Sequence, residues 1–329
     1  MKRLLGYITK GPALIVAPSP GLDSGVHSVD DKYLVISTDP CIDVPVNLFG
    51  WLLINYAASD VALSGAHPQY CTINLLGSPS TSSKVIFRVM DQACRAADEI
   101  GMQIVTGHTG TYRGLSTLVG VCTAYGIIEK KNLITAGGAV DGDCILCTRN
   151  LGFEIAVNLS LVNEPLSNNL FGKKVTERLQ KSTKTQSCVK DALLLGNTNG
   201  VHALHDATEG GLVAALNEIA EASSVGFTID SEMLPFAEET QFLRGYFLLS
   251  ETEVLSMSST GTVIAAISPE SKPTVLEELR KHGVKASVIG KFTKDTKRII
   301  VKNKRESGFP KKERDPYERI LSWDDSKRA

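Results

Sequence analysis

The chain has 329 residues, of which 43% are hydrophobic and 22% charged, a composition that is typical of globular proteins and excludes disordered and collagen-like chains. Thirty-five Lys and Arg residues against 36 Asp and Glu leave a net charge of −1, so we expect no nucleic-acid partner. Because no apolar run approaches the roughly 18 residues of a membrane span, and Gly6 and Lys10 interrupt any signal-like core, we expect a cytoplasmic protein without membrane contact.

Hydrophobic periodicity predicts a mixture of strands and helices along the whole chain. In the first half, strands are expected at 33–38, 70–76, 103–106 and 118–128, and helices at 50–64 and 84–100. In the second half, strands are expected at 144–148, 262–267 and 296–301, and helices at 187–196, 210–222 and 273–282. This order of elements favours an α+β fold.

Turn-forming residues near position 142 mark the expected domain boundary. We therefore predict an N-terminal domain at 1–142, a C-terminal domain at 143–301 and a charged tail at 302–329. The tail holds nine basic and six acidic residues among 28, which favours a solvated segment with one short helix. The alternative is a segment that docks on a protein partner through Tyr317, Leu321 and Trp323.

One motif in the second half combines an acid, a glycine pair and the start of a helix. The apolar face of this helix is formed by residues at the spacing i, i+3, i+4 and i+7: Leu212, Ala215, Leu216 and Ile219. Thr208 occupies the expected N-cap position, and Gly210 and Gly211 would leave backbone N–H groups free to hold an anion. Asp206 lies just upstream, where a carboxylate suits a bridging metal. The alternative is a plain capped helix with acidic residues in its first turn.

Several polar residues of the first half lie at the edges of predicted elements. Asp39 follows the first predicted strand, and Asp23 lies in a glycine-flanked turn. Asp60 lies in an otherwise apolar helix, where a charge is costly unless it is paired, hydrogen-bonded to a neighbouring loop, or bound to metal. His108 and Thr109 lie in a small-residue loop after a strand. Acids scattered in this way are typical of a hard-cation phosphate site.

Together these segments resemble the superfamily of AIR synthase, the hydrogenase-maturation protein HypE, thiamine-monophosphate kinase and selenophosphate synthetase, and HypE most of all. The most specific match runs from His205 to Ala220. Four earlier segments match in the family's order: Asp23–Val26, Ser37–Asp39, Ser59–Pro68 and Val105–Thr109. The likeness spans about residues 18 to 300.

The resemblance implies a PurM-like two-domain fold. Its N-terminal α/β domain would dimerise into a β-barrel, its C-terminal domain would be α+β, and ATP and Mg²⁺ would lie at the dimer interface. The resemblance makes Asp23, Asp39, Asp60 and Asp206 ligands of Mg²⁺ and phosphate. It places His108, Thr109, Gly210 and Gly211 in contact with the nucleotide. A homodimer is also expected because the strand at 33–38 would otherwise be an exposed edge.

The sequence departs from the family pattern at three places. Leu22 stands beside Asp23 where the family often has a second acid, and His108 stands where it often has an acid, although His is a softer ligand. HypE carries a C-terminal cysteine that is carbamoylated and dehydrated to a thiocyanate, whereas the last cysteine of this sequence is Cys188. We therefore expect the family's fold and ATP site, but not the reaction of HypE itself.

Three functions remain open from the sequence. The first is an ATP- and Mg²⁺-dependent enzyme that acts by phosphoryl transfer, or by ATP-driven activation, on a small molecule. The second is a nucleotide-binding or maturation scaffold that has lost catalysis, and Leu22, His108 and the missing C-terminal cysteine favour it. The third is a thiamine-phosphate kinase.

Overall fold

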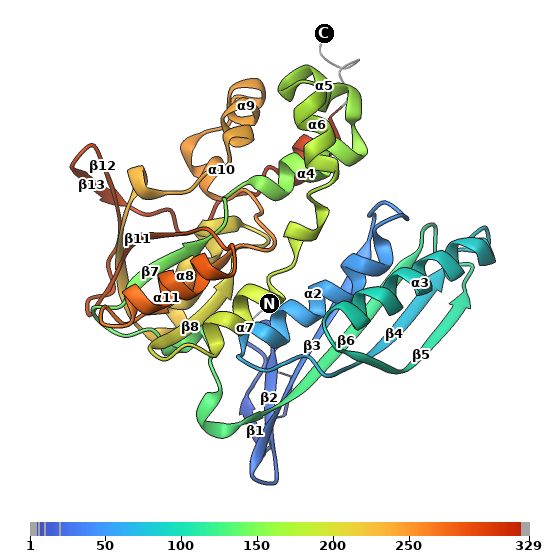
Figure 1. Cartoon of the computed structure of the whole chain (residues 1–329), viewed down its shortest axis with the longest axis horizontal. Coiled ribbons are helices and arrows are strands. Elements are labelled where there is room, and N and C mark those ends of the chain that lie inside the picture. Colours follow the sequence, from blue (N-terminus) through green and yellow to red (C-terminus); the bar gives the residue numbers. More distant parts are fainter. Residues whose placement is uncertain (1–4, 6, 10, 20, 324–329) are drawn as a thin grey trace. The chain divides into compact units, whose positions relative to one another are not determined.

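The computed structural model describes residues 5, 7–9, 11–19 and 21–323. The contacts within the chain divide it into two compact units, Met1–Ile134 and Thr135–Ala329, which follow one another along the colour bar of Figure 1. The expected boundary at 142 therefore lies a few residues inside the second unit. Residues 324–329 of the predicted tail lie outside the described residues.

The first unit is built on one six-stranded sheet. Its strands are β1 (Leu14–Val16), β2 (Gly25–Val29), β3 (Lys32–Ile42), β4 (Tyr70–Gly77), β5 (Gln103–Thr111) and β6 (Val119–Glu129). They lie in the order β1-β2-β3-β6-β4-β5, and only the β4–β5 pair is parallel. Because β3 lies between β2 and β6, the expectation that the strand at 33–38 forms an exposed edge is wrong.

Two helices, α2 (Phe49–Leu63) and α3 (Ser83–Glu99), lie along this sheet (Figure 1). Along β3 the residues Val35, Ser37 and Cys41 are buried, while Thr38 and Ile42 are exposed, so one face of the strand is covered by α2. The helices approach each other closely at Gly50, where an added Cβ would lie 2.1 Å from the Val89 carbonyl oxygen.

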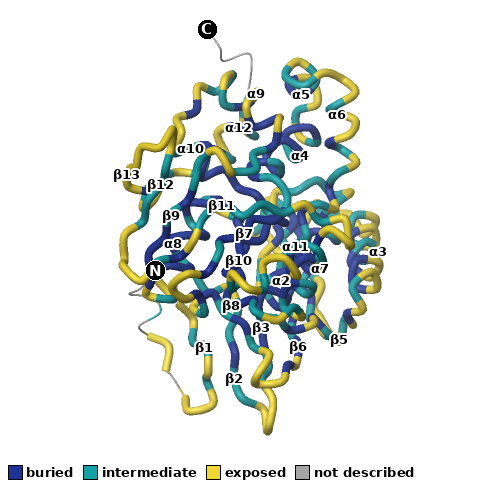
Figure 2. The backbone as a smooth tube through the Cα atoms, turned by 60° about the vertical axis from the view of Figure 1, so that its left-hand side comes forward, coloured by how far each residue is buried: buried dark blue, intermediate teal, exposed yellow. Residues whose placement is uncertain are grey.

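The second unit is built on a seven-stranded sheet. Its strands are β7 (Cys144–Thr148), β8 (Val201–Asp206), β9 (Gly226–Asp230), β10 (Val263–Ile267), β11 (Ala286–Thr293), β12 (Arg298–Lys302) and β13 (Arg305–Gly308). They lie in the order β13-β12-β9-β11-β7-β10-β8. Every residue of β10 is buried, because β10 is an interior strand whose two neighbours, β7 and β8, are also largely buried (Figure 2).

Three helices belong to this sheet: α7 (Val189–Gly196), α8 (Gly211–Ser223) and α11 (Lys272–Lys281). The remaining helices are α4 (Phe153–Val162), α5 (Glu164–Phe171), α6 (Lys173–Gln180), α9 (Glu238–Phe247), α10 (Glu251–Leu255) and α12 (Tyr317–Leu321). Short 3₁₀ turns occur at Lys130–Asn132 in the first unit, and at Ala136–Gly138, Thr183–Gln186 and Ser231–Met233 in the second.

As far as Trp323, the C-terminal segment packs on the second unit, so the expectation of a solvated segment is wrong, whereas the expected short helix is present as α12. Phe309 is buried against Phe227, and Ile320 is completely buried in an apolar cluster formed with α4, α6 and α9. Tyr317, Leu321 and Trp323, the three residues that could have docked on a partner, pack against this same cluster. Although the segment is rich in charge, its few apolar residues are spaced so that they reach the cluster together.

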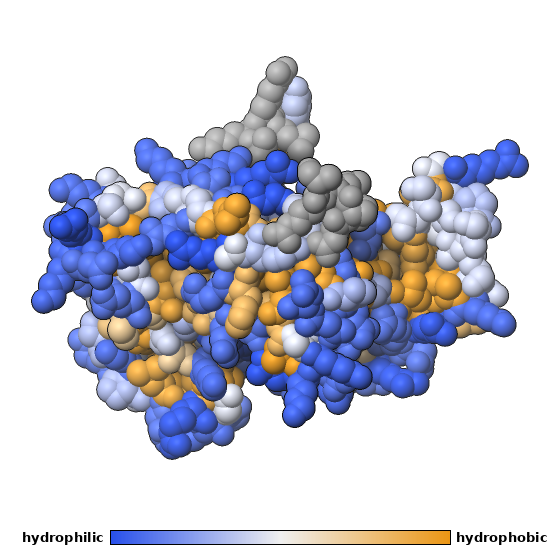
Figure 3. Space-filling model, turned by 90° about the horizontal axis from the view of Figure 1, so that it is seen from above, coloured by the Kyte–Doolittle hydropathy of each residue, from blue (hydrophilic) through white to orange (hydrophobic). Residues whose placement is uncertain are grey.

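Hydrophilic residues lie between hydrophobic ones across the face that Figure 3 shows. Among the described residues, no helix combines the length and the apolar composition that crossing a membrane would require.

Candidate functional site

Two of the predicted carboxylates of the first unit meet at one hydroxyl group. The Ser37 hydroxyl donates to Asp60 Oδ2 at 2.7 Å and to Asp39 Oδ2 at 3.4 Å. Ser37 and Asp39 are two residues apart on β3, so they share the face that α2 covers, and Asp60 comes from α2 itself. The strand and the helix therefore bring these three polar groups together inside the first unit.

The turn that contains Asp23 is linked to this group through the next residue, Ser24. The hydroxyl of Ser24 donates to the backbone carbonyl of Asp60 at 2.8 Å, which fixes the start of β2 beside the same turn of α2. Asp23 is exposed, whereas Asp39 and Asp60 are half-buried. The polar atoms of this group are carboxylate and hydroxyl oxygens, which are the donors that Mg²⁺ prefers. The residues present therefore fit a hard divalent cation.

His108 and Thr109 lie inside β5 and not in a loop, contrary to expectation. The pairing of strands places His108 opposite Asn74, Asn74 opposite Val121, and Val121 opposite Pro40. Three strand spacings separate His108 from β3, which is about 14 Å. Since Pro40 and Asp39 point to opposite faces of the sheet, His108 also lies on the other face. Its Nε2 lies 2.7 Å from the Tyr112 hydroxyl, and the structure does not bring it to the carboxylates.

The glycine motif of the second unit joins β8 to α8. His205 and Asp206 end β8, and both are buried. Gly210 is the N-cap of α8 and has a φ of 81°. A residue with a Cβ would adopt this φ only with strain. Thr208 is therefore not the N-cap, contrary to expectation. Its hydroxyl instead lies 3.5 Å from Asp206 Oδ1, as a donor to that carboxylate.

The N–H groups of the glycine pair are not free, so that expectation is also wrong. Gly211 donates to the Thr208 carbonyl at 2.8 Å. Gly210 donates to Asp315 Oδ2 at 3.2 Å, and Asp315 Oδ1 accepts from the Tyr317 N–H at 2.9 Å. A carboxylate of the C-terminal segment thus lies where a bound anion was expected, because a helix N-terminus attracts any negative charge.

A buried acid lies near the same end of the sheet. Glu154, in the first turn of α4, accepts from the Ser258 hydroxyl at 2.5 Å and from the Thr260 N–H at 2.8 Å. Burial raises the pKa of Glu154, and the charge of Asp206 adds to that shift. Burial likewise raises the pKa of Asp315 to about 6, with a further contribution from Glu154. In the second unit the charge of Asp206 therefore acts on Glu154, and the charge of Glu154 acts on Asp315.

Sequence reasoning missed Glu154, Ser258 and Asp315 as members of this cluster. A signal for Glu154 was present, because it is the one acid in the otherwise apolar helix Phe153–Val162, the same pattern that singled out Asp60. No local signal marked Asp315, since its neighbours suggested a solvated tail and its contacts are with residues far away in the sequence.

The chain matches two family models over most of its length. Residues 21–128 match the AIR synthase related protein, N-terminal domain, and residues 140–302 match the corresponding C-terminal domain. The chain therefore belongs to the AIR synthase related family. This confirms the resemblance inferred from the motifs and the PurM-like two-domain fold; the dimeric barrel stays a prediction.

The chain is similar to carbamoyl dehydratase HypE of Escherichia coli. The two are 30% identical over 280 residues, which cover 82% of this chain and 79% of the relative. A crystal structure of E. coli HypE, at 26% identity, superposes with a TM-score of 0.69 and covers 84% of this chain and 86% of that one.

Two ligand-bound structures share the fold at lower identity. A HypE in complex with ATP has a TM-score of 0.68 at 21% identity and covers 95% of this chain and 91% of its own. A ThiL complexed with AMPPCP and TMP has a TM-score of 0.69 at 19% identity and covers 88% of this chain and 90% of its own.

Proposed function

We propose that this chain binds ATP together with Mg²⁺ and uses the nucleotide in phosphoryl transfer to, or activation of, a small molecule. The observation that carries the proposal is the group formed by Ser37, Asp39 and Asp60 in the first unit. Family membership supports it, since a HypE and a ThiL of the same fold have been obtained with ATP and AMPPCP.

In this proposal Asp39 and Asp60 hold the cation, and Asp23 contributes from the exposed turn beside them. Bound Mg²⁺ would neutralise charge on the phosphates. The Ser37 hydroxyl, through its donated hydrogen bond, keeps the Asp60 carboxylate in one orientation. Phosphoryl transfer requires mainly positioning and charge stabilisation, which a fixed pair of carboxylates can supply.

Asp206 is a separate candidate ligand within the second unit, because it is buried and lies beside the Thr208 hydroxyl. We assign no phosphate contact to Gly210 and Gly211, whose N–H groups are engaged. His108 and Thr109 lie in β5 and away from Asp39 within one protomer, and their contact with the nucleotide stays a prediction for the proposed dimer.

Titration calorimetry with Mg·ATP tests the proposal. Asp60→Asn removes the charge of one ligand with little change of size, and it should weaken Mg·ATP binding by about tenfold or more. Asp98→Asn, on the exposed side of α3 in the same unit, is the matched control and should bind like the parent. Asp206→Asn tests the second unit in the same way. Equal affinities of parent and Asp60→Asn, or no binding at millimolar nucleotide, would overturn the proposed site.

The second candidate function is a nucleotide-binding scaffold without catalysis. The contact between Asp315 and the Gly210 N–H favours it, because this carboxylate occupies a position that could otherwise help to bind phosphate. Steady-state ATP turnover with a panel of small metabolites, thiamine monophosphate among them, separates the two functions. Turnover that depends on one added metabolite supports the enzyme, and binding without turnover supports the scaffold.

We also propose a homodimer, on the family resemblance and on the free edges of the first sheet. The edge strands of the first sheet are β1 and β5, and β5 is exposed along most of its length, so an edge is available for pairing. Sedimentation equilibrium at micromolar concentration should show twice the mass of 35.4 kDa, and a monomer alone would overturn this proposal.

A further inference from the structure

The second unit contains a pocket of about 1110 Å³ that has no part in the nucleotide site proposed above. Its basic lining residues are Arg149, Lys181, Lys184, Lys190 and Lys285, and its only acidic one is Asp191. The chain as a whole has a net charge of −1, so this concentration of positive charge is local.

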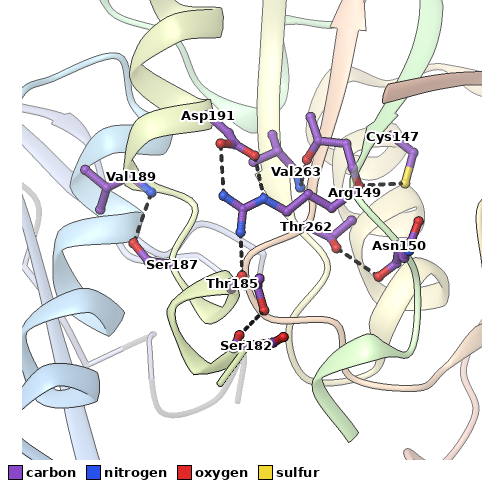
Figure 4. A network of polar contacts seen from close by, with 11 residues as sticks. Cys147, Arg149, Asn150, Ser182, Thr185, Ser187, Val189, Asp191, Thr262 and Val263 are labelled. Atoms are coloured by element: carbon purple, nitrogen blue, oxygen red, sulfur yellow. Dashed lines mark hydrogen bonds and ion pairs between the residues drawn. The ribbon is translucent and has the colours of Figure 1, made fainter. Parts of the chain in front are cut away.

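Two of the lining residues, Arg149 and Asp191, form an ion pair (Figure 4). Arg149 Nε and one of its terminal nitrogens donate to the two oxygens of Asp191, at 2.7 Å and 3.0 Å, and the other donates to the Thr185 carbonyl at 2.6 Å. Asp191 is buried, and the pair cancels its charge. Asp191 balances the charge of the guanidinium, so the net positive charge of the lining comes from the lysines.

Two backbone features show that the pocket wall is tightly specified. Arg149 has a φ of 55°, a left-handed conformation that a residue other than glycine keeps only when its surroundings enforce it. A Cβ added to Gly261 would lie 1.9 Å from the Thr185 carbonyl oxygen, so the loop before β10 is pressed against the 3₁₀ turn at Thr183–Gln186. The Thr185 carbonyl therefore lies against both the Arg149 guanidinium and the Gly261 backbone.

The lysines that surround this wall are exposed. Among the described residues, Lys181, Lys190 and Lys285 form no ion pair, and all three are exposed. Apolar residues line the same pocket: Phe153, Leu193, Leu194 and Val284. A pocket of this kind can bind a ligand that has one anionic end and one apolar end.

We propose that this pocket binds a small phosphate ester with an apolar body. Lysine ammonium groups on flexible stems act as point charges and suit a phosphate, whereas planar two-point recognition of a carboxylate is the property of an arginine fork. Here the only arginine fork in the lining already holds Asp191. A phosphate monoester carries nearly two negative charges at neutral pH, and a carboxylate carries one, so several lysines favour the phosphate.

Titration of the full chain with phenyl phosphate tests this proposal, with benzoate and phenol as probes that lack the dianion or any charge. Phenyl phosphate should bind, and benzoate and phenol should bind about tenfold more weakly, which corresponds to about 1.4 kcal/mol. The affinity should also fall as salt is added, because the lysines are exposed. Equal affinities for phenol and phenyl phosphate, or no binding of phenyl phosphate at about 10 mM, would overturn the proposal.

The variant Lys190→Gln/Lys285→Gln removes two of the pocket's charges and should weaken phenyl phosphate binding by about tenfold. Lys272→Gln, an exposed residue at the start of α11 and outside the lining, is the matched control and should bind like the parent. Thermal melting verifies that both variants are folded. The same variants titrated with Mg·ATP separate the two proposals: if the double variant weakens ATP as much as phenyl phosphate, the pocket belongs to the nucleotide and a separate site is refuted.

Discussion

Replacement of Ile320 by alanine would show whether the C-terminal segment is part of the second unit's core. Ile320 is completely buried and is packed with residues of α4, α6 and α9. Ile→Ala substitutions at buried positions destabilise a protein by 2–5 kcal/mol, and the cost is lower where the site can collapse. Because α12 has five residues and lies in a terminal segment, we expect the lower end, about 2–3 kcal/mol.

Urea denaturation followed by tryptophan fluorescence can measure this loss within the second unit. The chain has two tryptophans. Trp51 lies in α2 of the first unit, and Trp323 packs on Phe247 in the second, with 5.4 Å between ring centroids. In a Trp51→Phe background the signal comes from Trp323 alone. Ile320→Ala should then lower the unfolding midpoint by about 1 M urea.

Glu318→Ala is the matched control, since Glu318 lies on α12 as well but is exposed. An exposed substitution of this kind should change the free energy of unfolding by less than about 0.5 kcal/mol. If Ile320→Ala also stayed within that range, the segment from Phe309 onward would not be packed as the structure has it, and the reasoning would be refuted.

Two further predictions concern a pair of glycines and the pKa of Asp315. Gly50→Ala should destabilise the first unit by more than about 2 kcal/mol, because the new Cβ would overlap the Val89 carbonyl. Gly245 lies in the exposed part of α9, and a Cβ added there would have no atom within 4 Å. Gly245→Ala should therefore raise the free energy of unfolding by about 0.5–1 kcal/mol. Asp315 has a folded-state pKa of about 6 against an ordinary 3.8, so the folded state binds more protons between these values, and stability should fall as pH rises through this window and level off above it. The difference in unfolding free energy between the parent and Asp315→Asn should therefore change by about 1–2 kcal/mol from pH 4 to pH 7 after allowance for solvent screening, and identical pH profiles would refute this.

Elements with a strong local pattern were predictable from the sequence. The helix expected at 84–100 is α3, because its apolar residues recur at helical spacing and form its buried face. The strands expected at 70–76 and 144–148 are β4 and β7, which are short β-branched and apolar runs between turns. When the apolar residues of one element recur at helical or strand spacing, the sequence alone predicts the type of the element and its buried face.

The neighbours of each element were not predictable from the sequence. No feature of residues 33–38 themselves predicts that this strand pairs with β2 along one edge and with β6 along the other. Helices α4, α5 and α6 have only 10, 8 and 8 residues, and their shared cluster includes residues from both α9 and α12. Such contacts join residues far apart in the chain, so a pattern read within a window of one helix does not contain them.

The start of α8 shows why a candidate site was harder to predict than a fold. Sequence reasoning predicted an anion-binding helix terminus at Gly210 and Gly211, because two glycines follow an acid and precede an amphipathic run. The same electrostatics apply to every carboxylate of the chain, and Asp315 reaches this terminus from over a hundred residues away. Its raised pKa shows that the Gly210 and Tyr317 N–H groups only partly offset the burial of the charge and the proximity of Glu154. An anion that uses the Gly210 N–H must therefore displace Asp315 first, and protonation of that carboxyl group would make the displacement easier.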